Sequence, residues 1–174
     1  AMAAGAPEAP VIGAGLARAD LRGGMTGGAA SVFDGDADAF GLSAPPPPAT
    51  QAAMEAEQIE AHCNALPIQM APGMVEAQRL RDAAFAAALL RAHDVGAPAA
   101  LVTGNGHARR DRASPAHLHA APPHLPLLVL RQVNRPAPRD SRAPFAPCPA
   151  GPAPVVDVLH LSAPPPARSP SLTA

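Results

Sequence analysis

Hydrophobic residues recur at helical spacing in two segments of the chain. The clearer segment is residues 74–93, where larger apolar side chains gather on one face and alanine fills most of the other. Residues 51–63 predict a second, shorter helix, with Thr50 as the expected N-cap and with Asn64 and Pro67 ending it. The pattern therefore predicts at least two helices, the longer of which is alanine-rich.

Short apolar runs predict strands before and after these helices. The runs are residues 11–14, 99–103, 127–133 and 155–159, and several meet glycine or proline at their ends. A strand, two helices and then further strands is the order of an α/β protein. We therefore expect an incomplete, mostly parallel sheet flanked by helices.

Composition separates the chain into two parts. Residues 1–133 form the expected domain, whereas residues 134–174 are a proline-rich tail with one short predicted strand near residues 155–161. The 174 residues carry a formal net charge of −1, which gives no reason to expect nucleic acid as a partner. No apolar run approaches the roughly 20 residues of a membrane span.

The predicted helix 74–93 places polar side chains on its larger apolar face. That face carries Met74, Val75, Gln78, Arg81, Asp82, Phe85 and Leu89. A buried amide, guanidinium and carboxylate are costly unless they are paired. Two interpretations remain open: Arg81 and Asp82 pair with neighbours and fix the packing, or the polar residues line a polar cavity or support a ligand.

Histidines supply the second set of candidate functional residues. His107 ends a Gly-Asn-Gly-His turn after the predicted strand 99–103, where a metal ligand, general base or haem ligand would stand, although a plain turn has the same pattern. Arg109 and Arg110 follow and could bind carboxylates or phosphates. His62, at the end of the predicted helix 51–63, is more typical of a structural or solvated residue. The spacing of His117, His119 and His124 can bind metal, but no carboxylate lies close by to favour a zinc site.

Three motifs in order carry a resemblance to a known family. They are His62-Cys63-Asn64-Ala65-Leu66-Pro67, then Met74-x-x-Ala77-Gln78-x-x-Arg81-Asp82-Ala83, then Gly104-Asn105-Gly106-His107-x-Arg109-x-Asp111. Together they resemble the ChaN-like haem-binding uptake family of the Tiki/TraB superfamily, over residues 11–133. Because the family's opening Gly-Glu-x-x-His motif is absent and the chain begins at Ala1, the resemblance implies the C-terminal part of that domain.

The resemblance implies haem as ligand and partner. Haem needs an apolar slot, an axial ligand and cations for its propionates. Met74, Phe85 and Leu89 are the expected walls, and Arg109 or Arg110 the propionate contacts. His117 stands where family members carry tyrosine, which this chain lacks, so His117 is the predicted axial ligand and His107 its competitor.

The resemblance also implies a setting and leaves rival functions open. It implies iron uptake at the cell envelope or periplasm, with membrane attachment only through a lipid anchor that this sequence does not contain, and a homodimer as one arrangement. In the superfamily's hydrolases a second Gly-x-x-His motif serves a metal-dependent site, so the chain could instead be a fragment of such an enzyme, with His107 as its metal ligand. A non-functional remnant is the third alternative.

Overall fold

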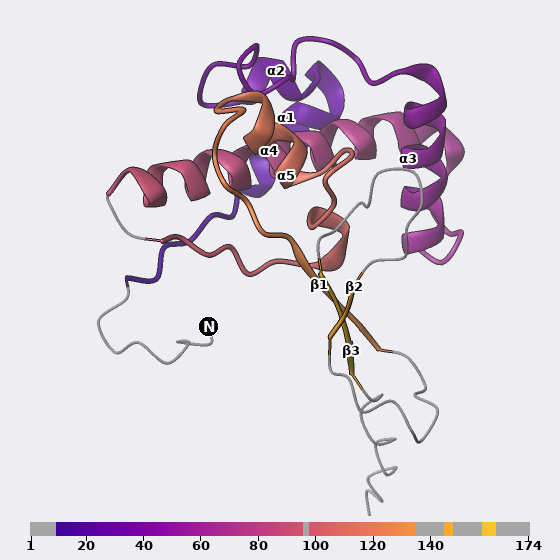
Figure 1. The fold of residues 1–174 in the computed structure, drawn as a ribbon. Helices are drawn as coiled ribbons and strands as arrows, with labels where there is room; N and C mark the ends of the chain where they lie inside the picture. The colour runs from indigo at the N-terminus through magenta and orange to yellow at the C-terminus, as the bar shows by residue number, and fades with distance from the viewer. Residues whose placement is uncertain (1–9, 96–97, 135–144, 148–157, 163–174) are drawn as a thin grey trace, which may run out of the picture.

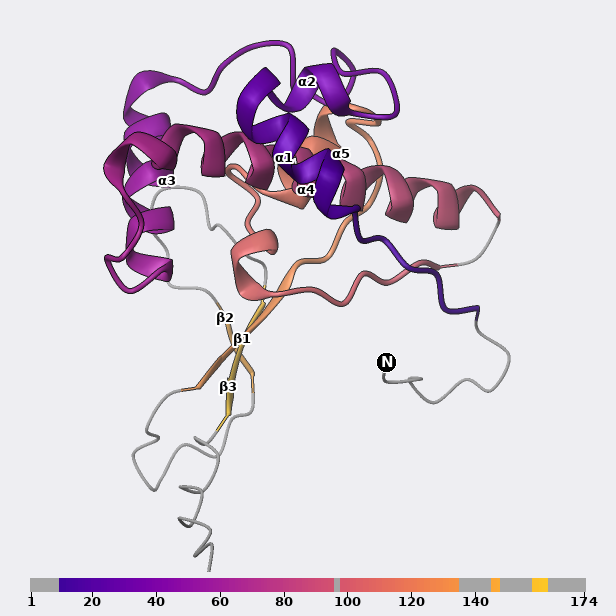
Figure 2. The same cartoon turned by 180° about the vertical axis from the view of Figure 1, so that it is seen from behind.

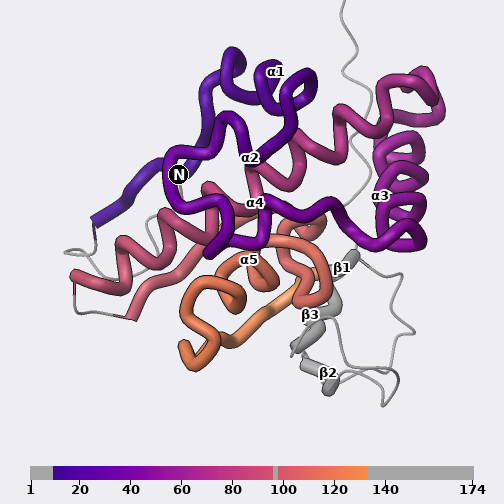
Figure 3. The backbone as a smooth tube through the Cα atoms, turned by 90° about the horizontal axis from the view of Figure 1, so that it is seen from above, coloured from indigo at the N-terminus to yellow at the C-terminus, as the bar shows by residue number. Residues whose placement is uncertain are grey.

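A long central helix organises the part of the chain that the structure, a computed structural model, describes: residues 10–95, 98–134, 145–147 and 158–162. Helix α4 runs through the middle, and α1, α2, α3 and α5 pack against it (Figures 1 and 2). Seen from above, α3 lies at one end of α4 (Figure 3). The helices are α1 (Arg18–Gly27), α2 (Ala29–Val32), α3 (Pro48–Ala61), α4 (Ala71–Asp94) and α5 (Ser114–Ala120), with 3-10 turns η1 (Ile68–Met70) and η2 (Asn105–His107).

Alanine and glycine let the neighbouring helices approach α4 closely. The predicted helix 74–93 is confirmed, with its first turn three residues earlier, at Ala71. A Cβ atom built on Gly73 of α4 would lie 2.8 Å from the backbone oxygen of Met25 in α1. One built on Gly24 of α1 would lie 2.9 Å from Cδ2 of Leu80 in α4. A larger residue at Gly73 would therefore force α1 and α4 apart, whereas one at Gly24 would require the Leu80 side chain to move.

Helix α3 begins earlier than the sequence pattern predicts. The helix expected over residues 51–63 is observed as Pro48–Ala61, and Thr50 is not its N-cap, because the helix starts at a proline that follows Pro47. Proline suits the first helical position, since its fixed φ is already helical and its missing N–H would be unpaired there. The helix ends as expected before Asn64, which has a left-handed φ of 59°.

The α/β prediction is wrong, because the body of the molecule is helical. Residues 11–14 and 99–103 are extended but pair with no neighbouring strand in the described part of the chain. Short apolar runs do not distinguish a strand from an extended segment, and a strand forms only when a partner completes its hydrogen bonds. Here the alanine-rich α4 is instead covered by other helices, which bury its apolar surface without a sheet.

The strands that are described form a small mixed sheet at the end of the chain. They are β1 (Leu130–Asn134), β2 (Phe145–Pro147) and β3 (Val158–Ser162). Their order is β1-β3-β2, with β1 parallel to β3 and β2 antiparallel to it. The sheet projects away from the helices (Figure 1). The strand predicted over 127–133 is thus observed only in its later part, and residues 155–157 of the last predicted strand lie outside the described residues.

The hydrophobic core lies between α4, α5 and the segment that leads to α3. Half of its buried members are alanine; the cluster is Ala29, Phe40, Leu42, Leu80, Ala83, Ala86, Ala87 and Leu118. The rings of Phe33 and Phe40 lie 5.2 Å apart at its edge. None of the helices described is both long enough and apolar enough to cross a membrane.

Candidate functional site

Asp82 is the centre of a buried polar cluster on α4. Its side chain is only 1% exposed. Oδ1 accepts hydrogen bonds from the backbone nitrogen of Ser114 at 3.1 Å, from Ser114 Oγ at 2.8 Å and from His107 Nδ1 at 2.8 Å. Gln78, one turn earlier, donates from Nε2 to Asp82 Oδ2 at 3.3 Å. The carboxylate therefore joins α4 to both η2 and the start of α5.

The His107 ring is held in one orientation by this cluster. A carboxylate oxygen only accepts, so the bond to Asp82 assigns the ring proton to Nδ1 and leaves a lone pair on Nε2. Gln78 Nε2 lies 3.0 Å from the same Nδ1, but with the proton on Nδ1 both atoms are donors, so this approach adds no hydrogen bond. The ring of Phe85 meets the His107 ring edge to face, with centroids 5.0 Å apart. A histidine fixed through Nδ1 by a carboxylate is the usual arrangement of an imidazole that ligates through Nε2.

His107 lies in the wall of a large, mostly apolar cavity of about 980 Å³. Leu89 of α4 and Leu118 of α5 line it from the helical body. The extended segments 98–103 and 126–130 form the opposite walls. Val102 and Leu128, in these walls, are 87% and 72% exposed, so the cavity has an open, apolar rim. Of the expected slot residues, Leu89 lines this cavity, Phe85 contacts His107, and Met74 does neither.

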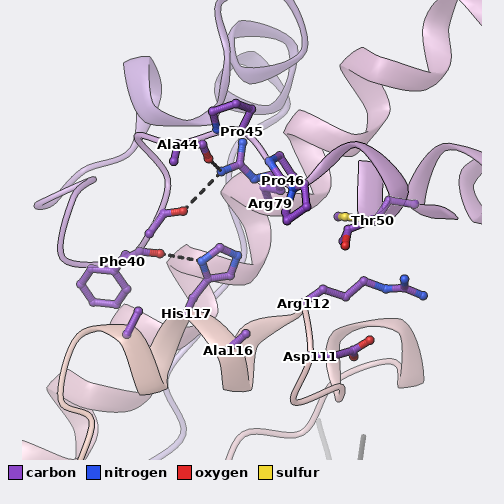
Figure 4. Close-up of a pocket in the computed structure, with 14 residues that line it drawn as sticks. Phe40, Ala44, Pro45, Pro46, Thr50, Arg79, Asp111, Arg112, Ala116 and His117 are labelled. Atoms are coloured by element: carbon purple, nitrogen blue, oxygen red, sulfur yellow. Dashed lines mark hydrogen bonds between the residues drawn. The ribbon is translucent and has the colours of Figure 1, made fainter. Parts of the chain in front are cut away.

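His117 lies elsewhere, in a second and smaller cavity of about 270 Å³ (Figure 4). Its side chain is buried in α5, and Nδ1 donates to the backbone oxygen of Phe40 at 2.6 Å. Burial lowers the pKa of His117, an effect that the hydrogen bond to Phe40 and the charge of Asp82 oppose and the charge of Arg79 reinforces. The two predicted axial ligands therefore face different cavities, which share no lining residue.

The remaining candidate residues line neither cavity. Arg109 makes two hydrogen bonds to Asp111, at 2.9 and 2.7 Å, which raise the pKa of Arg109 and lower that of Asp111. Arg110 donates to the backbone oxygen of Leu127. Arg81 is half-buried, and Asp82 bonds to His107, Ser114 and Gln78 rather than to it. His62, which is exposed, contacts the backbone oxygen of Gln58 through Nδ1 at 2.7 Å.

Two interactions of the site region were not foreseen from the sequence. Ser114 supplies two of the hydrogen bonds to Asp82, and a serine before a proline at a helix start was the available signal. Arg79 is buried and holds the loop before α3, donating from Nη2 to the backbone oxygens of Gly41, Leu42 and Ala44. Its Nη1 donates to Glu76 at 2.7 Å. The helical periodicity gave no sign that Arg79 would be buried.

Comparison with known families identifies the chain. Within the described residues, no group of three or more histidines, cysteines or acidic residues is placed to hold a metal ion. No curated protein and no solved structure matches the chain. A family model described as haem-binding uptake, Tiki superfamily, ChaN matches residues 1–118, two thirds of the sequence. The chain belongs to this haem-binding uptake family.

Proposed function

We propose that this chain binds one haem in the large apolar cavity, with Nε2 of His107 as an axial ligand. The observation that carries the proposal is the fixed His107 ring in the wall of a cavity of about 980 Å³. Membership of the haem-binding uptake family supports the ligand class. Haem itself would supply the iron and its redox chemistry, and the protein would supply the pocket and the ligand.

The dimensions and walls of the large cavity suit a flat, apolar macrocycle. Pockets for small molecules and cofactors usually measure about 300–1,000 Å³ and are mostly apolar with few polar groups. The large cavity is at the upper end of that range, and leucine, valine, alanine and proline make up most of its walls. The small cavity beside His117, at about 270 Å³, falls below the range. This size difference favours His107 over His117 as the ligand of haem.

The hydrogen bond from His107 to Asp82 would make the imidazole a stronger ligand. A carboxylate that accepts the Nδ1 proton fixes the tautomer and raises the basicity of Nε2. Gln78 and Ser114 hold that carboxylate in turn, at 3.3 and 2.8 Å. Asp82 and Gln78 thus support the ligand in this proposal, which is the second of the two roles that the sequence left open for the polar helix face.

The propionates of the bound haem would face solvent at the open rim. Arg109 and Arg110, the residues expected to bind them, line neither cavity, and Arg109 is already paired with Asp111. The exposed Val102 and Leu128 mark the side of the cavity that is open to solvent. Ionised carboxylates are most stable where water reaches them.

Titration with haemin tests the proposal. We expect a saturable Soret band at one haem per chain for the wild type. His107→Ala should lose the histidine-ligand spectrum, whereas His117→Ala is the matched control and should retain it. Loss in His117→Ala with retention in His107→Ala would move the axial ligand to His117. Equal spectra in all three proteins would end the haem proposal for this cavity.

We further propose, on family membership alone, that the protein serves iron uptake at the cell envelope. Fractionation of the source cells tests the location, since an envelope protein should be recovered in the membrane or periplasmic fraction. Recovery in the cytosolic fraction alone would contradict it. Growth on haem as the iron source, with and without the gene, tests the role in uptake.

A further inference from the structure

The smaller cavity, which His117 lines, has mostly apolar walls. It lies between the loop before α3, the first turns of α3 and one face of α5 (Figure 4). Its walls are largely apolar and include Phe40, Met54, Ala116 and the prolines at positions 45–47. At about 270 Å³ it exceeds the roughly 150 Å³ of a cavity that holds benzene. It therefore has room for one six-membered ring with a substituent.

His117 directs an unused hydrogen-bond acceptor into this cavity. The ring is 8% exposed, and Nδ1 donates its proton to the backbone oxygen of Phe40 at 2.6 Å. A carbonyl oxygen cannot donate, so Nε2 carries the lone pair. Figure 4 shows the far edge of the ring facing the space enclosed by Pro46, Arg112 and Ala116. Among the residues that the structure describes, no hydrogen bond to Nε2 is found, so this nitrogen can accept one from a molecule in the cavity.

The charged groups around the cavity already have partners. Arg79 donates to Glu76 and to three backbone oxygens of the loop. Arg112 donates to Glu57, and Asp111 is bound by Arg109. A ligand that brought a net charge would have to break one of these pairs. The cavity thus offers one free acceptor, Nε2 of His117, to a neutral group that donates a hydrogen bond.

We propose that the small cavity binds a neutral, single-ring compound of the phenol class, whose O–H or N–H donates to Nε2 of His117. The ring packs against the loop prolines and Ala116, and the donor forms a hydrogen bond with Nε2 of His117. This site is distinct from the proposed haem site, because the two cavities have no lining residue in common.

Phenol and anisole form a matched pair of probes, since they share the ring and differ in the donor. The histidine ring nitrogens are followed by NMR while each compound is added to the full chain. Phenol should bind saturably and move the Nε2 signal of His117, with the signals of His107 unchanged. Anisole should bind at least about tenfold more weakly, as expected for one lost hydrogen bond to a buried acceptor.

Two alanine variants separate binding from folding. Ala116→Leu fills the cavity from α5 and should abolish phenol binding, whereas Ala53→Leu, on the exposed face of α3, should bind phenol as the wild type does. Circular dichroism checks that both variants fold. Equal binding of phenol and anisole, an unmoved His117 signal, or phenol binding that survives Ala116→Leu would each overturn the proposal. So would the absence of saturable binding, which would mean that the cavity holds only water.

Discussion

Replacing Asp82 with alanine should destabilise the fold more than any other single loss of a carboxylate in the described chain. The substitution removes the acceptor of four hydrogen bonds, from the Ser114 nitrogen and hydroxyl, from His107 and from Gln78. Asp82 is only 1% exposed, so bulk water does not reach the donors that lose the carboxylate. Three of the four donors that lose their partner are on α5 and η2, so the damage reaches beyond α4.

The expected magnitude follows from counting the donors that stay buried. The Ser114 hydroxyl can rotate and the Gln78 amide is half-buried, so each can find another partner. The Ser114 N–H and the His107 Nδ1–H remain without an acceptor, and each costs about 1–3 kcal/mol. We therefore expect Asp82→Ala to lower the free energy of unfolding by about 3–4 kcal/mol. Breaking a buried pair by removing one partner typically costs about the same.

Urea unfolding at pH 7, followed by far-ultraviolet circular dichroism, measures this loss. Asp34→Ala is the matched control, because Asp34 is exposed, and it should change the free energy of unfolding by less than about 0.5 kcal/mol. Asp82→Asn keeps one acceptor oxygen and should fall between the two. If Asp82→Ala were as stable as Asp34→Ala, the carboxylate would not hold η2 and α5 to α4, and the support given to His107 would have to be abandoned.

Three further changes test the packing around α4. Gly73→Ala should lower the free energy of unfolding by about 1–2 kcal/mol despite the better helix propensity of alanine, because its Cβ would meet the Met25 oxygen at 2.8 Å. Thermal unfolding measures this loss, and Gly15→Ala is the control, because a Cβ at Gly15 would meet no atom within 4 Å. Arg79→Met should cost about 2–4 kcal/mol by urea unfolding, because three loop oxygens lose their donor; a cost below 1 kcal/mol would contradict this. Burial lowers the pKa of His117, so its contribution to stability is complete above the ordinary value of about 6.5 and is lost as pH falls through the lower folded value. His117→Gln should therefore reduce the pH dependence of unfolding between about pH 7 and pH 5, and an unchanged slope would refute the assignment.

Helices α3 and α4 could be predicted because they depend on local patterns that the sequence shows directly, whereas α1, α2 and α5 were not predicted. Residues 74–93 have a long, regular distribution of alanine and larger apolar side chains, and the helix is observed there. The strands depend on partners far along the chain. Residues 99–103 have the composition of a buried strand, yet without a paired neighbour they remain extended, and Val102 stays 87% exposed.

The site residues were recognisable singly, but their grouping was not. Gln78 and Asp82 were conspicuous as polar residues on an apolar helix face, and His107 as the end of a glycine turn. Gln78 and Asp82 contact His107 only because of the path that the chain takes from α4 to η2, and no local sequence pattern specifies that path. Arg109 was predicted as a propionate contact, and in the structure its guanidinium pairs with Asp111, two residues later.

The haemin titration of wild type, His107→Ala and His117→Ala tests the central proposal most directly. It depends on the different positions of the two histidines, one beside a cavity of about 980 Å³ and the other beside one of about 270 Å³. We expect one haem per chain, with the histidine-ligand Soret spectrum lost in His107→Ala and kept in His117→Ala. A His107→Ala protein that binds haem with the wild-type spectrum and affinity would contradict it.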